Sequence, residues 1–130
     1  MSDAAKVGIT GLGGVFFRAK DPAALSRWYA EKLDLSVEKW GGVVFRRENE
    51  REGATTAWSP FKEGSDYFGR PEQTFMLNYR VLDLDHALAE LERRGVEIVP
   101  KRDEGEHGRF AWIVDCEGNR VELWEPPAGR

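Results

Sequence analysis

The sequence is poor in the residues that build disulfides and metal sites. It has a single cysteine, Cys116, and two histidines among 130 residues. One cysteine cannot form an internal disulfide or a cysteine-based metal cage, and two histidines exclude a three-histidine metal site. A chain without disulfides suits a reducing compartment, so we expect a cytoplasmic protein.

Long apolar runs and an excess of positive charge are also missing. The longest apolar stretch, at about residues 11–17, is far too short to span a bilayer, and Met1 to Lys6 lack the apolar core of a secretory signal. The formal net charge is −4, whereas a nucleic-acid-binding protein usually carries a basic face. We therefore expect neither a membrane nor a nucleic acid as a partner.

The chain does have enough apolar surface for one small folded domain. Hydrophobic residues make up 41% of it, including five tryptophans, seven phenylalanines and three tyrosines. This composition is typical of a globular protein and excludes wholesale disorder. The length fits a single domain over residues 1–130.

An internal repeat is the most informative pattern. Asp21 and Asp83 lie 62 positions apart, and each follows a strand-like run and precedes a helical one, as a helix N-cap does. Apolar periodicity predicts helices at about residues 22–33 and 84–94. Alternation predicts strands at residues 13–18, 36–40, 43–47 and 54–59 in the first copy, and at 75–80, 97–100, 109–114 and 119–125 in the second. Each copy therefore has the order β-α-β-β-β.

The remaining segments are predicted as loops. Two charge-rich stretches, residues 46–52 and 101–107, are most simply solvated connections between strands. Residues 60–74 join the two copies and contain Phe61, Tyr67 and Phe68. Linkers rarely carry so many aromatic residues, so we expect part of this stretch to pack as a lid or a crossing arm.

A duplicated β-α-β-β-β unit of this length resembles the vicinal oxygen chelate superfamily, which includes glyoxalase I, bleomycin-resistance proteins and extradiol dioxygenases. Three segments carry the resemblance: Gly13-Gly14-Val15-Phe16-Phe17-Arg18 with Asp21-Pro22 and Trp28-Tyr29; Val81-Leu82-Asp83-Leu84-Asp85 with Ala87 to Gly95; and Asp115-Cys116-Glu117-Gly118-Asn119-Arg120-Val121-Glu122-Leu123-Trp124-Glu125-Pro126. The last is similar to the family's Asp-Pro-x-Gly-Asn-x-x-Glu ending.

The resemblance implies an α+β fold. Two βαβββ modules, about residues 9–60 and 74–127 joined by residues 61–73, would form a curved, cup-shaped mixed sheet with the helices outside and a pocket within. Relatives cover the sheet edges with a second chain, so we expect a homodimer. Whether the modules are exchanged between subunits cannot be predicted from the sequence.

In metal-using relatives, one ligand comes from the first strand and one from the last strand of each module. The resemblance carries these positions over to Gly14, Thr56, Met76 and Glu122. Relatives typically have histidine or glutamate there, and only Glu122 keeps such a side chain. One carboxylate cannot hold a divalent ion strongly, because such sites need about three protein ligands. We therefore expect no metal and no other cofactor.

A displaced metal site remains an alternative at one place. His107 lies close in sequence to Glu104 and Glu106, in a glycine-bearing charged stretch. These side chains are suitable ligands, but the same pattern is typical of a solvated hairpin tip.

Glu122 is the candidate catalytic residue. Its neighbours Val121 and Leu123 are apolar and should face the helices, so Glu122 should face the pocket. A lone carboxylate in an aromatic pocket could act as a base or bind a ligand. The alternative is a structural ion pair, and the candidate partners are Arg120, Arg80 and Arg18.

The same alternation predicts the rest of the pocket lining. The candidate ligand-binding residues are Thr56, Trp58, Met76, Asn78, Arg80 and Trp124. Trp58 and Trp124 are related by the repeat and are expected to face each other across the cup. Aromatic walls with a few polar groups suit a flat, largely apolar organic ligand. Alternatively, the tryptophan pair closes the core between the modules.

Two functions are consistent with these residues. The first is a metal-independent small-molecule binder of the bleomycin-resistance type, with an aromatic pocket. The second is an enzyme of the glyoxalase (lyase) or dioxygenase type with an atypical centre that uses Glu122. Neither hypothesis identifies the ligand or substrate.

Overall fold

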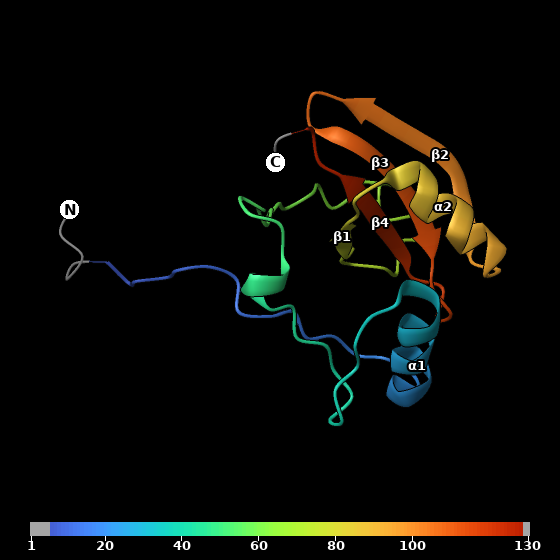
Figure 1. The fold of residues 1–130 in the computed structure, drawn as a ribbon, viewed down its shortest axis with the longest axis horizontal. Coiled ribbons are helices and arrows are strands. Elements are labelled where there is room, and N and C mark those ends of the chain that lie inside the picture. Colours follow the sequence, from blue (N-terminus) through green and yellow to red (C-terminus); the bar gives the residue numbers. More distant parts are fainter. Residues whose placement is uncertain (1–5, 129–130) are drawn as a thin grey trace.

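The computed structural model describes residues 6–128, so Met1 to Ala5, on which the secretory-signal prediction depends, lie outside it. Figure 1 shows the helices beside one open sheet, whose strand pairs are both parallel and antiparallel. The elements are α1 (Pro22–Leu33), the short 3-10 helix η2 (Arg47–Asn49), β1 (Asn78–Arg80), α2 (Leu84–Arg93), β2 (Glu97–Gly105), β3 (Gly108–Val114) and β4 (Arg120–Glu125). The predicted α+β class is confirmed.

The sheet is built entirely from the second half of the chain. Its strand order is β1-β4-β3-β2, with β1 parallel to β4 and the other pairs antiparallel. Along the chain the order is β1, α2, β2, β3 and β4, which is the β-α-β-β-β order predicted for the second copy. Strand β4 therefore lies in the middle of the sheet, between β1 and β3.

Both helices begin and end where local chemistry favours it. The side chains of Asp21 and Asp83 each accept a hydrogen bond of 3.1 Å from the backbone N–H three residues on, as N-caps do. Helix α1 ends at Asp34, whose φ of 60° is left-handed, and α2 is followed by Gly95 at φ 79°. The structure ends α2 at Arg93, one residue earlier than predicted. Within residues 6–128 neither helix is long and apolar enough to cross a membrane.

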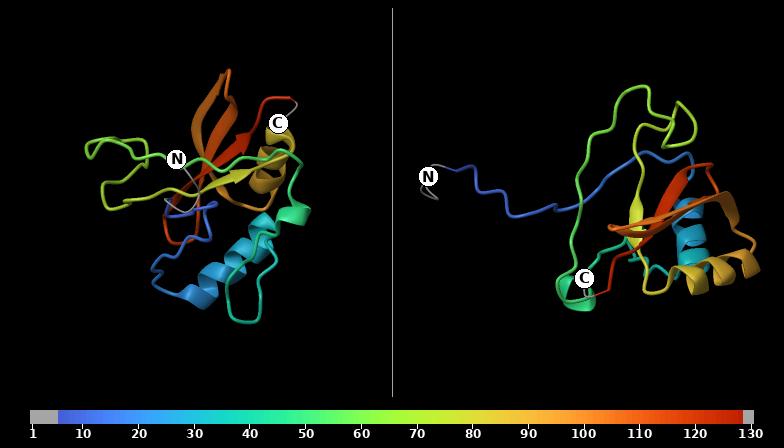
Figure 2. Two further views of the ribbon diagram at one scale, coloured as in Figure 1. Left: turned by 90° about the vertical axis from the view of Figure 1, so that its left-hand side faces the viewer. Right: turned by 90° about the horizontal axis from the view of Figure 1, so that it is seen from above.

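The hydrophobic core lies between the helices and one face of the sheet, and Figure 2 shows both helices on that side. Val121 and Leu123 on β4 point into it, as their apolar character predicts. The buried members of the core are Leu25, Tyr29, Leu84, Leu88, Leu91, Val96, Ala111, Ile113, Val121 and Leu123. Side chains that alternate with these on the strands face the opposite, helix-free side of the sheet.

The strands predicted for the first copy are not formed within residues 6–128. Residues 13–18, 36–40, 43–47 and 54–59 contain a single isolated bridge, between Val37 and Val43. A strand needs a neighbour that supplies N–H and C=O partners, and in the part of the chain that the structure describes these segments have no such neighbour beyond this one bridge. Their apolar side chains stay in solvent: Phe16 is 92% exposed and Trp58 81%.

The prediction for residues 101–107 is also corrected. Strand β2 continues through this charged stretch to Gly105 and pairs with β3 as far as Gly108. The side chains are charged because β2 is an edge strand, where they remain solvated while the backbone pairs on one side. Conversely, β1 begins at Asn78, later than the predicted start at Phe75.

Candidate functional site

Glu122 lies on the helix-free face of the sheet, at the middle of β4. In the strand register it is opposite Asn78 of β1 and Trp112 of β3. Opposed residues in neighbouring strands project from the same face, so both side chains flank the carboxylate. Glu122 is only 7% exposed and Trp112 1%.

Three neutral groups donate hydrogen bonds to this buried carboxylate. The Asn78 amide donates to Oε1 at 2.6 Å, and the Trp112 indole donates to Oε2 at 3.0 Å. The hydroxyl of Tyr67, from the segment that joins the two copies, also donates to Oε2. A carboxylate offers about four acceptor positions, and no second group within residues 6–128 donates to Oε1, so one position there is open to a further donor.

The predicted alternative of a structural ion pair is wrong for the described chain. Arg80 pairs with Glu50 and donates to the Thr55 carbonyl at 2.6 Å. The Arg120 guanidinium donates to the Tyr67 carbonyl at 3.4 Å, and Arg18 is exposed. None of the ion pairs formed within residues 6–128 joins Glu122 to an arginine.

An aromatic cluster of Phe61, Tyr67, Phe68 and Trp112 lies beside the carboxylate and contacts it through Tyr67 and Trp112. The Tyr67 ring meets Trp112 edge-on, with centroids 5.7 Å apart, and stacks on Phe61 at 5.0 Å. Phe68 packs against Phe61 at 5.2 Å. These contacts confirm that part of residues 60–74 folds down onto the sheet.

A cation lies over the same rings. The Lys101 ammonium of β2 is 5.3 Å from the Trp112 ring and 5.9 Å from the Tyr67 ring, both within the range of a cation–π interaction. Burial, followed by the hydrogen bond to Glu122 and its negative charge, raises the pKa of Tyr67. The phenol therefore keeps its proton and acts as a donor at neutral pH.

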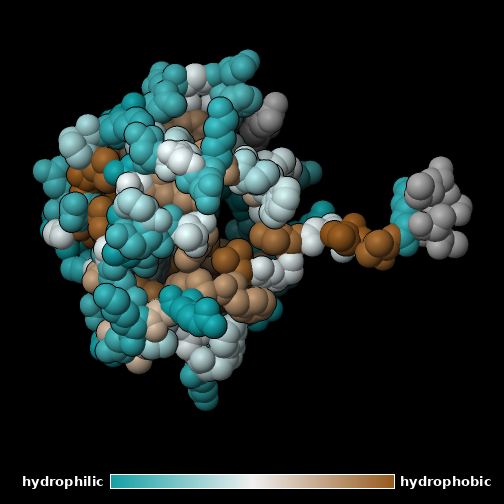
Figure 3. All heavy atoms as spheres, turned by 180° about the vertical axis from the view of Figure 1, so that it is seen from behind, coloured by the Kyte–Doolittle hydropathy of each residue, from teal (hydrophilic) through white to brown (hydrophobic). Residues whose placement is uncertain are grey.

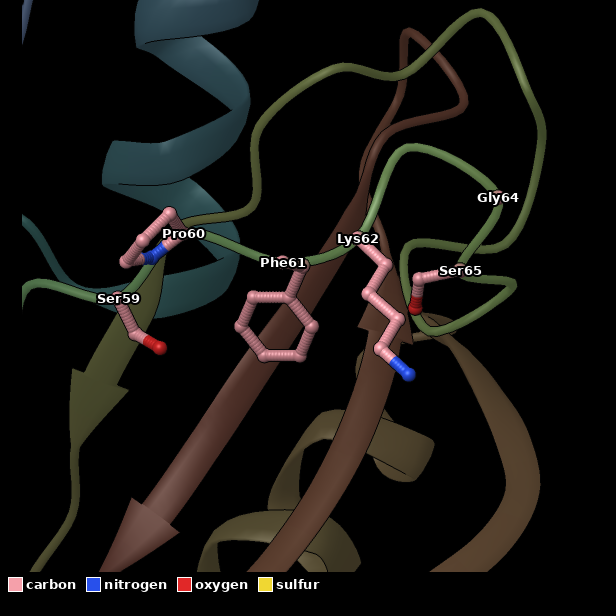
Figure 4. A pocket seen from close by; sticks show the side chains of 6 residues that line it. All are labelled: Ser59, Pro60, Phe61, Lys62, Gly64 and Ser65. Atoms are coloured by element: carbon pink, nitrogen blue, oxygen red, sulfur yellow. The ribbon is translucent and has the colours of Figure 1, made fainter.

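A hollow of about 640 Å³ opens beside the aromatic cluster. It is lined by Ser59, Pro60, Phe61, Lys62, Gly64 and Ser65. In Figure 4 the side chains of Phe61 and Lys62 extend to the same side of this segment, and Phe61 belongs to both the hollow and the cluster. All six lining residues are exposed, so the hollow is an open depression on the surface of this segment, next to the cluster through Phe61.

The predicted site residues fall into two groups. Asn78, Arg80 and Trp124 belong to the sheet, and the register pairs Arg80 with Trp124 next to the Asn78–Glu122 pair. Trp124 stacks on Phe110 at 6.2 Å. Met76 is half-buried just before β1, whereas Thr56 and Trp58 are exposed. No hydrogen bond or ring contact within residues 6–128 connects Thr56 or Trp58 to Glu122.

Sequence reasoning missed Tyr67, Trp112 and Lys101 as site residues. Trp112 could have been found, because it alternates with Ala111 and Ile113 in a strand that was predicted over residues 109–114. Lys101 was missed because residues 101–107 were predicted to be a solvated loop, in which a side chain has no defined place on the sheet. Tyr67 lies in an irregular segment, where no periodicity indicates which way a side chain points.

The residues present do not fit the metal site of metal-using relatives. Of the four positions carried over, Gly14 has no side chain, and both Glu122 oxygens accept hydrogen bonds from protein donors. Within residues 6–128, no three His, Cys, Asp or Glu side chains come together as a metal site. At the alternative position, His107 is exposed with its ring 3.7 Å from Glu106, while Glu104 pairs with Arg109.

The most family-like segment has a structural role at its first residue. Asp115 is 6% exposed and accepts hydrogen bonds from the Tyr29 hydroxyl at 2.7 Å and from two backbone N–H groups, of Glu117 and Asn119. Burial, and then this hydrogen bond, raises the pKa of Tyr29, which keeps the hydroxyl a donor. Asp115 thus holds the turn before β4 and connects it to α1.

The neighbouring thiol has the wrong environment for a nucleophile. Cys116 follows Asp115 in the turn and is exposed. Partial desolvation and the negative charges of Asp115 and Glu117 raise the pKa of its thiol. The reactive thiolate is therefore disfavoured at neutral pH.

Comparison with known proteins gives a family and a fold. Residues 14–124 match the model of the glyoxalase-like domain family. A glyoxalase/bleomycin resistance protein/dioxygenase superfamily member from Sphaerobacter thermophilus is 20% identical, with a TM-score of 0.50 over 82% of this chain and 90% of that one. TioX from Micromonospora sp. ML1 is 18% identical, with a TM-score of 0.50 over 83% and 92% of the two chains.

One further solved structure is similar, and the curated proteins give no match. An antibiotic binding protein from Streptomyces sp. CB03234 is 22% identical, with a TM-score of 0.49 over 82% of this chain and 88% of that one. No curated protein matches the chain significantly. Because the family match spans most of the sequence and includes both helices and the strand that carries Glu122, the chain belongs to the glyoxalase-like domain family.

Proposed function

We propose that the protein is a metal-independent binder of a small organic molecule, which lies over Glu122 on the helix-free face of the sheet. One observation carries the proposal: a buried carboxylate, hydrogen-bonded only by neutral donors, sits within an aromatic cluster beside a hollow. Aromatic walls with a few polar groups favour a flat, largely apolar ligand that offers a hydrogen-bond donor.

The residues of the sheet supply the fixed part of this site. Asn78 and Trp112 hold the Glu122 carboxylate in one orientation, so the ligand would meet an acceptor whose geometry is already set. Arg80 and Trp124, one register step away, would border the ligand on the same face. We propose that Met76, Thr56 and Trp58 complete the lining when the first half of the chain is paired.

Pairing of the first half is proposed to occur with a second copy of this chain. Large exposed apolar side chains concentrate there, among them Val7, Ile9, Phe16 and Trp58. Figure 3 shows apolar residues along the extended N-terminal segment that projects from the body. In a homodimer these strand-like segments would gain the partners that one chain does not supply, and the two-module cup would then be complete.

The homodimer predicts a mass of about twice the 14.8 kDa of one chain in multi-angle light scattering at micromolar concentration. Phe16→Asp places a charge on the 92% exposed Phe16 of the first half and should shift the protein toward the monomer. The matched control, Leu82→Asp, changes a 75% exposed residue of the second half and should leave the mass unchanged. A single-chain mass for the unmodified protein would contradict the proposal.

Ligand binding itself is tested by thermal shift. A ligand that binds only the folded state stabilises it by mass action, so members of a panel of planar aromatic compounds should raise the melting temperature in proportion to their affinity. Tryptophan fluorescence should respond to the same compounds, because Trp112 lies in the site. A stoichiometric metal in protein purified without chelators would contradict the metal-independent part of the proposal.

An enzyme that uses Glu122 as a general base is the second candidate. The open acceptor position on Oε1 favours it, because a base needs a free lone pair directed at the substrate. It predicts product formation in glyoxalase-type or dioxygenase-type assays that Glu122→Gln abolishes. The binder predicts saturable binding without turnover.

A further inference from the structure

Tyr67 differs from the other two groups that donate to Glu122. Asn78 and Trp112 belong to paired strands, whereas Tyr67 lies in the irregular segment between the two halves. The far end of that segment is fixed, because buried Gln73 exchanges hydrogen bonds of 2.8 and 2.7 Å with the backbone of Arg120. Within residues 6–128, no backbone–backbone hydrogen bond joins Tyr67 to the sheet: its side-chain contacts and one hydrogen bond of 3.4 Å, from the Arg120 guanidinium to its carbonyl, hold it there.

The contacts of the Tyr67 side chain are those of a bound aromatic molecule. Its ring stacks on Phe61 and meets the edge of Trp112, and its hydroxyl donates to Glu122. The Lys101 ammonium lies over its ring face. The phenol is therefore in contact with one acceptor, three aromatic rings and one cation, of which the acceptor, the Trp112 ring and the cation belong to the sheet.

We infer that Tyr67 determines the specificity of the site: its phenol occupies the ligand's place on Glu122, and the ligand is a neutral hydroxyl-bearing aromatic molecule that displaces it. The inference rests on the proposed function, because it names the class of ligand for the same site. A ligand hydroxyl would restore the hydrogen bond to Oε2 that the departing phenol gives up, so no buried acceptor is left unpaired.

The charges around the site favour a neutral ligand over a cationic or an anionic one. A cationic ligand would approach the Lys101 ammonium, which already lies 5.3 Å from the Trp112 ring, and would be repelled. An anionic ligand has no proton with which to donate a hydrogen bond to Glu122, and the negative charge of the carboxylate would repel it. A neutral hydroxyaromatic ring offers the electron-rich face that Lys101 prefers, and its hydroxyl replaces the donor that Glu122 loses when Tyr67 is displaced.

The first test uses p-cresol, which is the tyrosine side chain without its backbone. Tyr67→Ala vacates the place, so this variant should bind p-cresol about tenfold tighter than toluene, which has the same shape but no hydroxyl. It should also bind p-cresol at least tenfold tighter than the unmodified protein does. Adding Glu122→Gln should reduce the preference for p-cresol over toluene, since the charged acceptor is lost.

A second test keeps the ring in place, in case Tyr67→Ala disturbs the fold. Tyr67→Phe removes only the competing hydroxyl and should bind 2-naphthol several-fold tighter than the unmodified protein. The matched control is Tyr79→Phe, on the helix side of the sheet, where Tyr79 packs against Tyr29. It should leave 2-naphthol binding unchanged.

The outcomes separate this inference from the proposed function. Equal binding of p-cresol and toluene to Tyr67→Ala, or weaker or unchanged binding of 2-naphthol by Tyr67→Phe, would overturn the role of Tyr67. If panel compounds still stabilise the protein in that case, the binding function stands without it. A third outcome is that Tyr67→Ala binds p-cresol while no panel compound stabilises the unmodified protein. The inference that the place of Tyr67 accepts a hydroxyaromatic molecule is then supported, and the proposed binding function is wrong.

Discussion

Replacing Asp115 by alanine is expected to lower the free energy of unfolding by about 3 kcal/mol. The side chain is buried and accepts hydrogen bonds from the Tyr29 hydroxyl and from backbone N–H groups of its own turn. Removing it leaves the buried Tyr29 hydroxyl and two half-buried backbone N–H groups without their acceptor, and an unsatisfied buried donor costs about 1–3 kcal/mol. Chemical denaturation followed by circular dichroism measures the change.

Two further variants distinguish the turn from the contact with α1. Tyr29→Phe removes one donor and leaves Asp115 its backbone partners, so it should cost only about 1 kcal/mol. Glu92→Ala changes an exposed acidic residue of α2 and should alter stability by less than about 0.5 kcal/mol. A loss of under 1 kcal/mol for Asp115→Ala would show that this turn does not hold β4 and α1 together.

The second large effect is expected on binding. Glu122→Gln should weaken the affinity for a ligand found in the thermal-shift panel by about 1–3 kcal/mol, the size of a hydrogen bond to a charged group. Stability should change by only about 1 kcal/mol, because the glutamine oxygen can still accept from Trp112 and Tyr67. Calorimetric titration and thermal melting of the same preparation give both numbers.

A glutamate on the opposite face of the same strand provides the control. Glu125 accepts hydrogen bonds from the Leu84 N–H at 2.8 Å and from Arg109 at 3.3 Å, so its partners lie at the start of α2 and at the start of β3. Glu125→Gln should leave ligand affinity unchanged. A large loss of stability for Glu122→Gln together with unchanged binding would instead make Glu122 a structural residue.

The parts of the fold that depend on local signals could be predicted from the sequence. Asp21 and Asp83 indicated both helix starts, and the apolar pair Val121 and Leu123 fixed which face of β4 meets the helices. That parity placed Glu122 and Asn78 on the helix-free face, where the structure joins them by a hydrogen bond. Alternation within a strand is a local pattern, so it assigns side chains to the two faces of the strand without any knowledge of the tertiary structure.

The parts that depend on distant partners could not be predicted. The alternation of residues 43–47 indicates a strand, but a strand forms only where another segment pairs with it, and among the described residues only the single Val37–Val43 bridge does so. Tyr67 reaches Glu122 across 55 positions from a segment without periodicity. Lys101 is exposed, as its charged neighbours indicate, but the strand pairing that brings its ammonium over two aromatic rings leaves no signal in the sequence.

The central claim is that the ligand lies over Glu122, against Trp112. The five tryptophans give five indole N–H signals in a nitrogen-15 correlation spectrum, and Trp112→Phe identifies the one that donates to Glu122. On addition of a panel ligand, we expect the Trp112 signal to shift more than the other four indole N–H signals. A saturating ligand that leaves the Trp112 signal in place and moves only those of exposed Trp40 and Trp58 would contradict it.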